Sequence, residues 1–158
     1  MLLAAGCSSQ RDLTREGLPP GAREWKLVKP SDPEGAKSVL MRAFSLVGTP
    51  YRWGGNTPQE GFDCSGLVNF VYRDMLAVKV PRTSRELAEW QGPKVKPEKL
   101  AAADLVFFSQ QGQVFHVGIY VGEGRFIHAP RTGKNVQLDR LDGPFWRDRY
   151  SGARRVLR

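Results

Sequence analysis

Three side chains of this 158-residue sequence are suited to nucleophilic catalysis, and they are Cys64, His116 and His128. Cys64 lies between an acid and a hydroxyl in the stretch GFDCSG, and the sequence contains no other histidines than these two. A thiol attacks as the thiolate, so it requires a base, and imidazole is the side chain that exchanges protons near neutral pH. The three residues therefore predict a cysteine nucleophile, a histidine base, and a second histidine that orients the first.

The apolar pattern after Cys64 predicts a helix that begins at the cysteine. Leu67, Phe70 and Val71 fall on one face of that helix, and Asp63 is placed to cap its N-terminus. Unpaired backbone N–H groups and the helix dipole favour a thiolate at this position. The sequence therefore predicts a lowered pKa for the Cys64 thiol.

Both histidines lie in a predicted β-hairpin, whose two strands and connecting loop are residues 114–121, 125–129 and 122–124. A loop with an odd number of residues sets Gly118 opposite His128. His116 is two residues from Gly118 and therefore shares its face of the sheet. The two imidazoles are then diagonal neighbours within side-chain reach, and we expect both to point towards the start of the Cys64 helix.

The remaining pattern predicts two more helices and two more strands. An apolar face over residues 33–47 indicates the first helix, and a capping box from Thr83 to Glu86 begins a short one. Residues 105–108 are typical of a buried strand, and residues 155–157 of a closing strand. Helices that precede an antiparallel sheet indicate an α+β fold.

Each of the three candidate residues also has a structural interpretation. A cysteine at the start of an amphipathic helix is often a small buried apolar residue, and two histidines on one sheet face can serve the fold alone. A zinc site of Cys64, His116 and His128 is chemically feasible, although the sequence has no close ligand pair of the CxxC or HxxxH kind. On this pattern we predict neither a metal nor a cofactor.

The second cysteine, Cys7, lies in the N-terminal stretch MLLAAGCSSQ. Small residues before a cysteine, followed by a polar run, resemble the lipobox of bacterial lipoproteins, although no basic segment precedes them. We therefore expect residues 1–7 to be the end of a lipoprotein-type signal, with a membrane anchor at Cys7, and residues 8–32 to be a flexible tether. A disulfide from Cys7 to Cys64 and an incidental cysteine in a frayed terminus are the alternatives.

The composition limits the partners. Lysine and arginine number 24 against 16 aspartates and glutamates, which gives a net charge of +8. These basic residues are scattered and form no motif that reads nucleic acid, so we expect no nucleic-acid partner. The charge suits either an anionic polymer or a plain solvated surface. No stretch approaches the roughly 18 apolar residues of a membrane span, and we expect a monomer with one folded domain.

Several stretches of the sequence resemble the NlpC/P60 family of cysteine peptidases, which are papain-like cell-wall hydrolases of bacteria. They are YRWGGNTPQEGFDCSGLVNFVY, VPRTS, ADLVFFS, HVGIYVGEGRFIHAP and WRDRYSGARRVL. The resemblance implies a papain-like catalytic domain over residues 33–158, with N-terminal helices packed on an antiparallel β-sheet. With the lipobox-like Cys7 in front, the chain is similar to murein endopeptidase lipoproteins of Gram-negative bacteria, which implies the periplasmic face of the outer membrane.

The resemblance also implies a role for each residue of the family's motifs. Cys64 would be the nucleophile, His116 the general base, and His128 the residue that orients His116. The residues implied in substrate binding or in holding the oxyanion are Tyr51, Asp63, Ser65 and Arg82. Arg82 would bind a substrate carboxylate, and a surface ion pair is the alternative for it.

The implied reaction is amide hydrolysis in the stem peptides of peptidoglycan through an acyl-enzyme thioester. The scissile bond is either the D-alanine–diaminopimelate cross-link or the γ-D-glutamate–diaminopimelate bond. Two other functions are considered on the same fold: a non-catalytic wall-binding scaffold and a lipid acyltransferase. Ala103 and Leu87 depart from the glycine and glutamine that are usual in the family.

Overall fold

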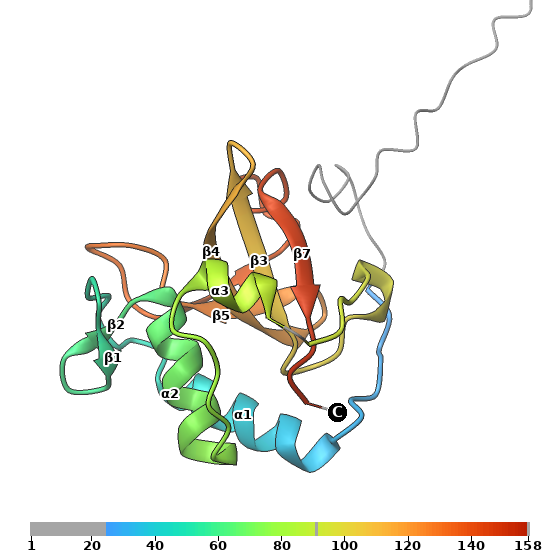
Figure 1. Cartoon of the computed structure of the whole chain (residues 1–158), viewed down its shortest axis with the longest axis horizontal. Helices are drawn as coiled ribbons and strands as arrows, with labels where there is room; N and C mark the ends of the chain where they lie inside the picture. Colours follow the sequence, from blue (N-terminus) through green and yellow to red (C-terminus); the bar gives the residue numbers. More distant parts are fainter. Residues whose placement is uncertain (1–24, 91, 158) are drawn as a thin grey trace, which may run out of the picture.

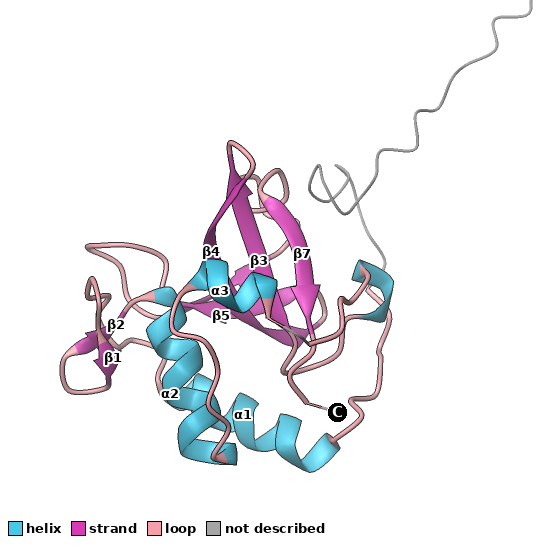
Figure 2. Cartoon of the chain, in the orientation of Figure 1, coloured by secondary structure: helices cyan, strands magenta, loops and turns pink. Residues whose placement is uncertain are grey.

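In the computed structural model, which describes residues 25–90 and 92–157, helices pack against a five-stranded antiparallel sheet (Figure 1). The strands follow the order β6-β5-β4-β3-β7 across the sheet. Figure 2 shows the helices gathered beside the sheet rather than alternating with its strands along the chain. This arrangement confirms the predicted α+β class with an antiparallel sheet.

The helices are α1 (Pro33–Ser45), α2 (Cys64–Leu76), α3 (Ser84–Glu89) and a 3₁₀ turn, η1 (Pro97–Lys99). The strands of the sheet are β3 (Leu105–Gln110), β4 (Gln113–Gly122), β5 (Arg125–His128), β6 (Gln137–Arg140) and β7 (Tyr150–Arg154). A separate short hairpin pairs β1 (Asn56–Thr57) with β2 (Gly61–Phe62).

Local capping interactions fix where the helices begin. The side chains of Asp32, Asp63 and Thr83 each accept a hydrogen bond from a backbone N–H of the helix that follows. The three helix starts predicted from the sequence are therefore confirmed. The helix α1 ends at Ser45, a little before the predicted end at Val47.

The closing strand lies earlier in the chain than predicted. It is β7, which ends at Arg154, and not residues 155–157. β7 pairs with β3, and the register shifts between Phe107 and Phe108. The apolar residue Leu157 lies beyond the strand, where it is buried in the core. Its apolar character therefore reflects packing rather than strand pairing.

The strand β6 is absent from the sequence prediction. Its residues alternate between half-buried and exposed, and it forms an edge of the sheet beside β5. Leu138 is its single apolar residue, and 37% of that residue is exposed, so the strand carries almost no apolar signal. This strand matters for the site, because it contributes Asp139.

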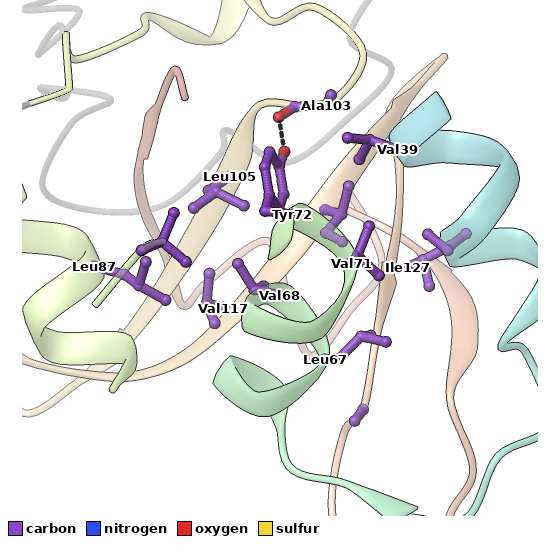
Figure 3. Packing of buried hydrophobic residues seen from close by; sticks show 14 of the residues in the cluster. Val39, Leu67, Val68, Val71, Tyr72, Leu87, Ala103, Leu105, Val117 and Ile127 are labelled. Atoms are coloured by element: carbon purple, nitrogen blue, oxygen red, sulfur yellow. Dashed lines mark hydrogen bonds between the residues drawn. The ribbon is translucent and has the colours of Figure 1, made fainter. Parts of the chain in front are cut away.

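The main core lies between the helices and one face of the sheet. Figure 3 shows α2 contributing Val68, Val71 and Tyr72 to this core, with Val117 of β4 and Ile127 of β5 facing the helix. Alternate residues along the strands point the other way and form a second cluster, which contains Val106, Phe108, Tyr120, Phe126 and Tyr150. The sheet is therefore covered on both faces, which explains why the sequence of β3 is apolar without alternation.

Ala103, where glycine is usual in the family, adopts a backbone conformation that favours glycine. Ala103 is buried and adopts a φ of 74°, in the left-handed region that glycine occupies without steric cost. Its carbonyl accepts a hydrogen bond from the hydroxyl of Tyr72, which anchors α2 to the segment that leads into β3 (Figure 3). The backbone of Ala103 is thus held in its left-handed conformation by burial and by the hydrogen bond from Tyr72.

The predicted tether and lipidation site lie mostly outside the described residues. Cys7 is among those that the structure does not describe, so the anchor remains a prediction. Within the described part of the tether, Trp25 packs against Tyr120 with ring centroids 6.4 Å apart, whereas Leu27 is 98% exposed. Within the described ranges, no helix combines the length and the apolar character needed to cross a membrane.

Candidate active site

Cys64 is a free thiol at the first position of α2. Asp63 caps this helix by accepting a hydrogen bond of 2.6 Å from the N–H of Gly66. α2 packs against β4, and the Cys64 sulfur lies beside the backbone N–H of Val117. Val117 directly follows His116, so the helix start brings the candidate nucleophile to the part of β4 that carries the candidate base.

The predicted lowering of the Cys64 pKa is wrong in direction. Burial of the sulfur raises the pKa of the thiol to about 11, and the nearby charge of Asp63 adds to this. Backbone N–H groups of Val117, Ser65 and Cys64 itself act in the opposite direction, but burial outweighs them. The helix-start argument found a real effect and missed the larger one, because burial depends on the tertiary packing. Cys64 therefore rests as a protonated thiol.

The two histidines lie in contact on the same face of the sheet. His116 Nε2 and His128 Nδ1 are 2.7 Å apart, and only 3% of His116 and none of His128 is exposed. The predicted shared face is confirmed. The rings lie on the sheet face that carries the second cluster, since His116 pairs with Phe108 of that cluster. That both rings point towards the start of the Cys64 helix stays a prediction.

The hairpin reaches this parity by a different route from the predicted one. The connection is a two-residue turn, Glu123-Gly124, in which both residues have positive φ, and Gly122 pairs with Arg125. A two-residue turn alone would place the histidines on opposite faces. A register shift between Tyr120 and Gly122 inserts one extra residue and restores the odd count. The histidines face the same side because of this bulge.

Gly118 provides the space for the second histidine. A Cβ at this position would lie 2.6 Å from the Phe126 ring and 3.3 Å from the Cβ of His128. A side chain here would therefore clash with the Phe126 ring and crowd the Cβ of His128. The glycine at position 118 therefore leaves room for Phe126 and His128 on the neighbouring strand.

Asp139 extends the pair of histidines into a chain of hydrogen bonds. Its Oδ2 lies 2.6 Å from His128 Nε2 and accepts a second hydrogen bond of 2.6 Å from the side-chain amide of Gln137. Neither Asp139 nor Gln137 is among the site residues predicted from the sequence, because β6 is not predicted either. The alternation Gln137-Leu138-Asp139 was the available signal, since it places the two polar side chains on one face of a strand.

Trp146 covers both imidazoles. Its indole is stacked on His116 with centroids 5.0 Å apart, and it meets the ring of His128 edge to face at 4.9 Å. Phe108 and Phe126 pack against the indole from the second cluster. Trp146 lies in the family-like stretch WRDRYSGARRVL, but the sequence predicts no role for it. Nothing in the local sequence shows that this indole returns to the histidines.

Burial keeps both histidines neutral. It is the main cause that lowers the pKa of His116 well below 6.5, and the charge of His128 lowers it further. Burial also lowers the pKa of His128, although Asp139 opposes this effect through its hydrogen bond and its charge. The resting site thus holds a neutral thiol and two neutral imidazoles. Among the described residues no hydrogen bond joins the Cys64 sulfur to either ring.

Tyr51 lies close to the nucleophile. Burial is the main cause that raises the pKa of its hydroxyl, followed by the charges of Cys64 and Asp63. The backbone N–H of Tyr51 donates a 2.9 Å hydrogen bond to the carbonyl of Lys134, which ties this loop to the connection between β5 and β6. The structure therefore places the Tyr51 side chain within electrostatic reach of Cys64.

Arg82 is engaged by Asp63. Its two terminal nitrogens lie 3.1 Å and 3.0 Å from the two carboxylate oxygens of Asp63, and one of them also donates a 2.7 Å hydrogen bond to Ser65 Oγ. The side chain of Arg82 remains 39% exposed. The structure thus gathers Asp63, Ser65 and Arg82 in one cluster beside Cys64. A substrate carboxylate would have to compete with Asp63 for the guanidinium.

The described ranges 25–90 and 92–157 contain no group of three or more His, Cys, Asp and Glu residues placed to hold a metal ion. The polar residues of the site instead form a hydrogen-bonded chain that runs from His116 to Asp139 and a cluster around Arg82. A free thiol at a helix start and a buried imidazole on the neighbouring strand are the two groups that a cysteine hydrolase requires.

Comparison with known proteins agrees with this chemistry. The model of the NlpC/P60 family matches residues 48–155, a range that includes every residue of the candidate site. The chain belongs to the NlpC/P60 family. The resemblance inferred from the sequence motifs is thereby confirmed, and so is the fold that it implied.

Curated relatives are about two fifths identical to this chain over the residues that match. Murein DD-endopeptidase MepH of Escherichia coli strain K12 is 43% identical over 124 residues, which cover 77% of this chain and 46% of that protein. Gamma-DL-glutamyl hydrolase of Bacillus subtilis strain 168 is 41% identical over 120 residues, which cover 74% of this chain and 28% of that protein. The chain therefore spans about half the length, or less, of these relatives.

A crystal structure of an NlpC/P60 family protein from Bacillus cereus has a closely similar fold. It superposes with a TM-score of 0.74 at 32% identity and covers 89% of this chain and 42% of the solved one. The fold and the family are thus established from both the sequence and the coordinates.

Proposed function

We propose that this protein is a peptidoglycan hydrolase, a cysteine endopeptidase that cleaves amide bonds of murein stem peptides or cross-links. The observation that carries the proposal is the 2.7 Å contact between His116 and His128, which lies beside the strand residue that meets the Cys64 sulfur. Murein DD-endopeptidase MepH, at 43% identity, supports the choice of substrate.

The resting protonation states define the first step. The thiol of Cys64 and the imidazole of His116 are both neutral, so the thiol proton must move to His116 as the sulfur attacks the substrate carbonyl. His116 Nε2 faces His128, which leaves Nδ1 as the nitrogen available to the thiol. The sulfur must turn from the Val117 amide to reach it, and catalytic hydrogen bonds commonly form only once substrate is bound.

In the remaining steps, the proton that His116 takes from the thiol passes to the leaving group. The new carbon–sulfur bond creates an oxyanion, which the Cys64 backbone N–H and the Tyr51 hydroxyl would stabilise. Protonated His116 then gives its proton to the leaving amine, the carbon–nitrogen bond breaks, and a thioester remains on Cys64. Water attacks the thioester while His116 takes its proton, and the thiol is restored when the carbon–sulfur bond breaks. No step uses a metal or a cofactor.

We place the scissile bond at the D-alanine–diaminopimelate cross-link. Support comes from the 43% identity to a murein DD-endopeptidase. The 41% identity to a gamma-DL-glutamyl hydrolase supports the second candidate, the γ-D-glutamyl bond. The cluster of Asp63, Ser65 and Arg82 would contact the substrate in either case, with Arg82 reaching a carboxylate that displaces Asp63.

Digestion of purified sacculi tests the proposal directly. Wild-type protein should release soluble fragments, whose masses identify the bond that was cut. Cys64→Ala and Cys64→Ser should release none and keep the circular dichroism spectrum of the wild type. Cys7→Ser is the matched control and should retain full activity in this assay. Full fragment release by Cys64→Ala would refute the cysteine mechanism.

The same assay separates the two rival functions. A wall-binding scaffold would sediment with sacculi without releasing fragments, and the wild type and the Cys64→Ala variant would sediment equally. A lipid acyltransferase would transfer an acyl chain from a phospholipid vesicle and leave the sacculi intact. Either result would replace the peptidase proposal.

We also propose that the protein acts in the cell envelope and is lipidated at Cys7. Support comes from the lipobox-like sequence and from the wall substrates named for the relatives. Intact-mass analysis of the full-length protein from membranes of its native host should show an acylated Cys7. A free or disulfide-bonded Cys7 in that material would refute the anchor.

A further inference from the structure

We propose that Asp139 is a positioning residue that fixes the tautomers of both histidines and thereby keeps Nδ1 of His116 unprotonated, ready to accept the thiol proton. The inference rests on the proposed function for its catalytic meaning, although the tautomers themselves are a property of the free protein. It concerns a residue on β6, the edge strand that no sequence motif marks.

The carboxylate of Asp139 lies at the end of the hydrogen-bond chain. Its Oδ2 is 2.6 Å from His128 Nε2 and 2.6 Å from Gln137 Nε2. The Gln137 amide nitrogen is a donor, so this oxygen already acts as an acceptor. Although partial burial raises the pKa of Asp139, hydrogen bonds from His128 and Gln137 lower it overall, so the group is ionised near neutral pH. An ionised carboxylate can only accept hydrogen bonds.

The proton positions follow one after another from this end. Asp139 accepts from His128, so His128 Nε2 carries a proton. His128 is neutral, so its Nδ1 is a lone pair and must accept the hydrogen bond from His116 Nε2. His116 is neutral as well, so its Nδ1 has no proton. The tautomer of His116, the proposed base, is thus determined by the carboxylate of Asp139, which lies two hydrogen bonds away.

A hydrogen-bond donor in place of the Asp139 carboxylate would reverse the direction of each hydrogen bond in the chain. His128 would then accept at Nε2 and donate from Nδ1, and His116 would accept at Nε2. The proton of neutral His116 would move to Nδ1, where it would prevent transfer from the thiol. Gln137 reinforces the correct polarity, because its amide occupies the same oxygen of Asp139 as a donor.

Because both imidazoles are buried, their tautomers depend on hydrogen bonds within the protein. His128 is fully buried and His116 is 3% exposed. Trp146 lies over both rings, and Phe126 packs against His128 with centroids 4.4 Å apart. Bulk water therefore has little access to the ring nitrogens, and the tautomers depend on the hydrogen bonds that the protein supplies.

Nitrogen NMR of the histidine rings tests this inference. The chain has only two histidines, so tag-free protein labelled with 15N-histidine gives two ring spin systems that long-range proton–nitrogen correlations can resolve. In the wild type at pH 7.5, both rings should be protonated at Nε2 and not at Nδ1. Asp139→Ala and Asp139→Asn should give a mixture or the reversed tautomer at His116. Asp142→Asn is the matched control, because Asp142 pairs with Arg140 on the surface and should leave both rings unchanged.

Kinetics on sacculi provide the second measurement. Both Asp139 variants should lower kcat by on the order of 100-fold with little change in KM, and Asp139→Glu should restore part of the loss. A proton on His116 Nδ1 in the wild type would overturn the proposal, as would unchanged tautomers in folded Asp139→Ala. Failure of wild-type protein to digest sacculi would instead refute the proposed function, since the ring spectra do not depend on turnover.

Discussion

The indole of Trp146 is stacked on the imidazole of His116, with the ring centroids 5.0 Å apart and the planes 25° from parallel. Trp146 follows β6 in the chain and precedes β7, so it reaches the histidine from a loop far downstream in the sequence. The stack restricts rotation of the base and shields it from water. Burial is the main reason that the pKa of His116 lies well below 6.5.

Trp146→Leu should therefore change the pH profile of the enzyme. Loss of the indole admits water to His116 and should raise its pKa towards 6.5, so the acid limb of kcat/KM should move to higher pH. We also expect kcat to fall by about tenfold, because the ring is less firmly oriented. Trp146→Phe retains an aromatic cover and should shift the limb less. An unchanged acid limb in Trp146→Leu would show that the indole does not control the protonation of His116.

The resting state of the nucleophile can be measured by alkylation. Burial raises the pKa of Cys64 to about 11, so its reaction with iodoacetamide should accelerate about tenfold per pH unit between roughly pH 7 and 9. The Cys7→Ser variant isolates this thiol, and Cys7→Ser with Cys64→Ser gives the background. A thiolate–imidazolium pair would react at a rate nearly independent of pH over the same range, and that result would contradict the neutral resting site.

The buried histidines should make the fold sensitive to mild acid. Their pKa values are lowered in the folded protein, so the unfolded chain binds more protons below pH 6.5. The stabilisation that comes from burying the neutral histidines should accordingly be fully present above pH 6.5. The free energy of unfolding should fall as the pH drops below 6.5, by about 1 kcal/mol per histidine per pH unit. Urea unfolding at pH 7.5 and 5.5 measures this loss. His116→Gln should lose less stability than the wild type between pH 7.5 and 5.5. An equal loss would show that titratable groups other than His116 cause the sensitivity to acid.

The end of α2 offers a test of backbone strain. Ala77 caps the helix with φ 53° and ψ 27°, a left-handed conformation, and its side chain is exposed. Glycine adopts this conformation without the steric cost, so Ala77→Gly should raise the free energy of unfolding by about 0.5–1 kcal/mol. Ala88→Gly, inside α3, should lower it by about 1 kcal/mol. Urea unfolding measures the free energy of unfolding of both variants. Destabilisation by Ala77→Gly would contradict the strain at Ala77.

Much of the site followed from short-range patterns. The cap at Asp63 and the helix start at Cys64 depend on residues within one turn of each other, so the sequence predicts them directly. The shared face of His116 and His128 follows from counting along two adjacent strands. The count was correct, although a bulge and a two-residue turn produce it in place of a three-residue loop. Such features are predictable because their partners lie close together in the chain.

The tertiary structure decided the protonation of the site. The helix dipole at Cys64 is local, but the burial that outweighs it depends on the packing of α2 against β4. Asp139 and Trp146 reach the histidines from an edge strand and a loop whose own sequences carry no apolar period that would reveal their destination. Contacts between residues distant in the chain, and the dielectric surroundings that they create, arise only when the whole core forms, because burial belongs to the assembled packing and not to any one segment.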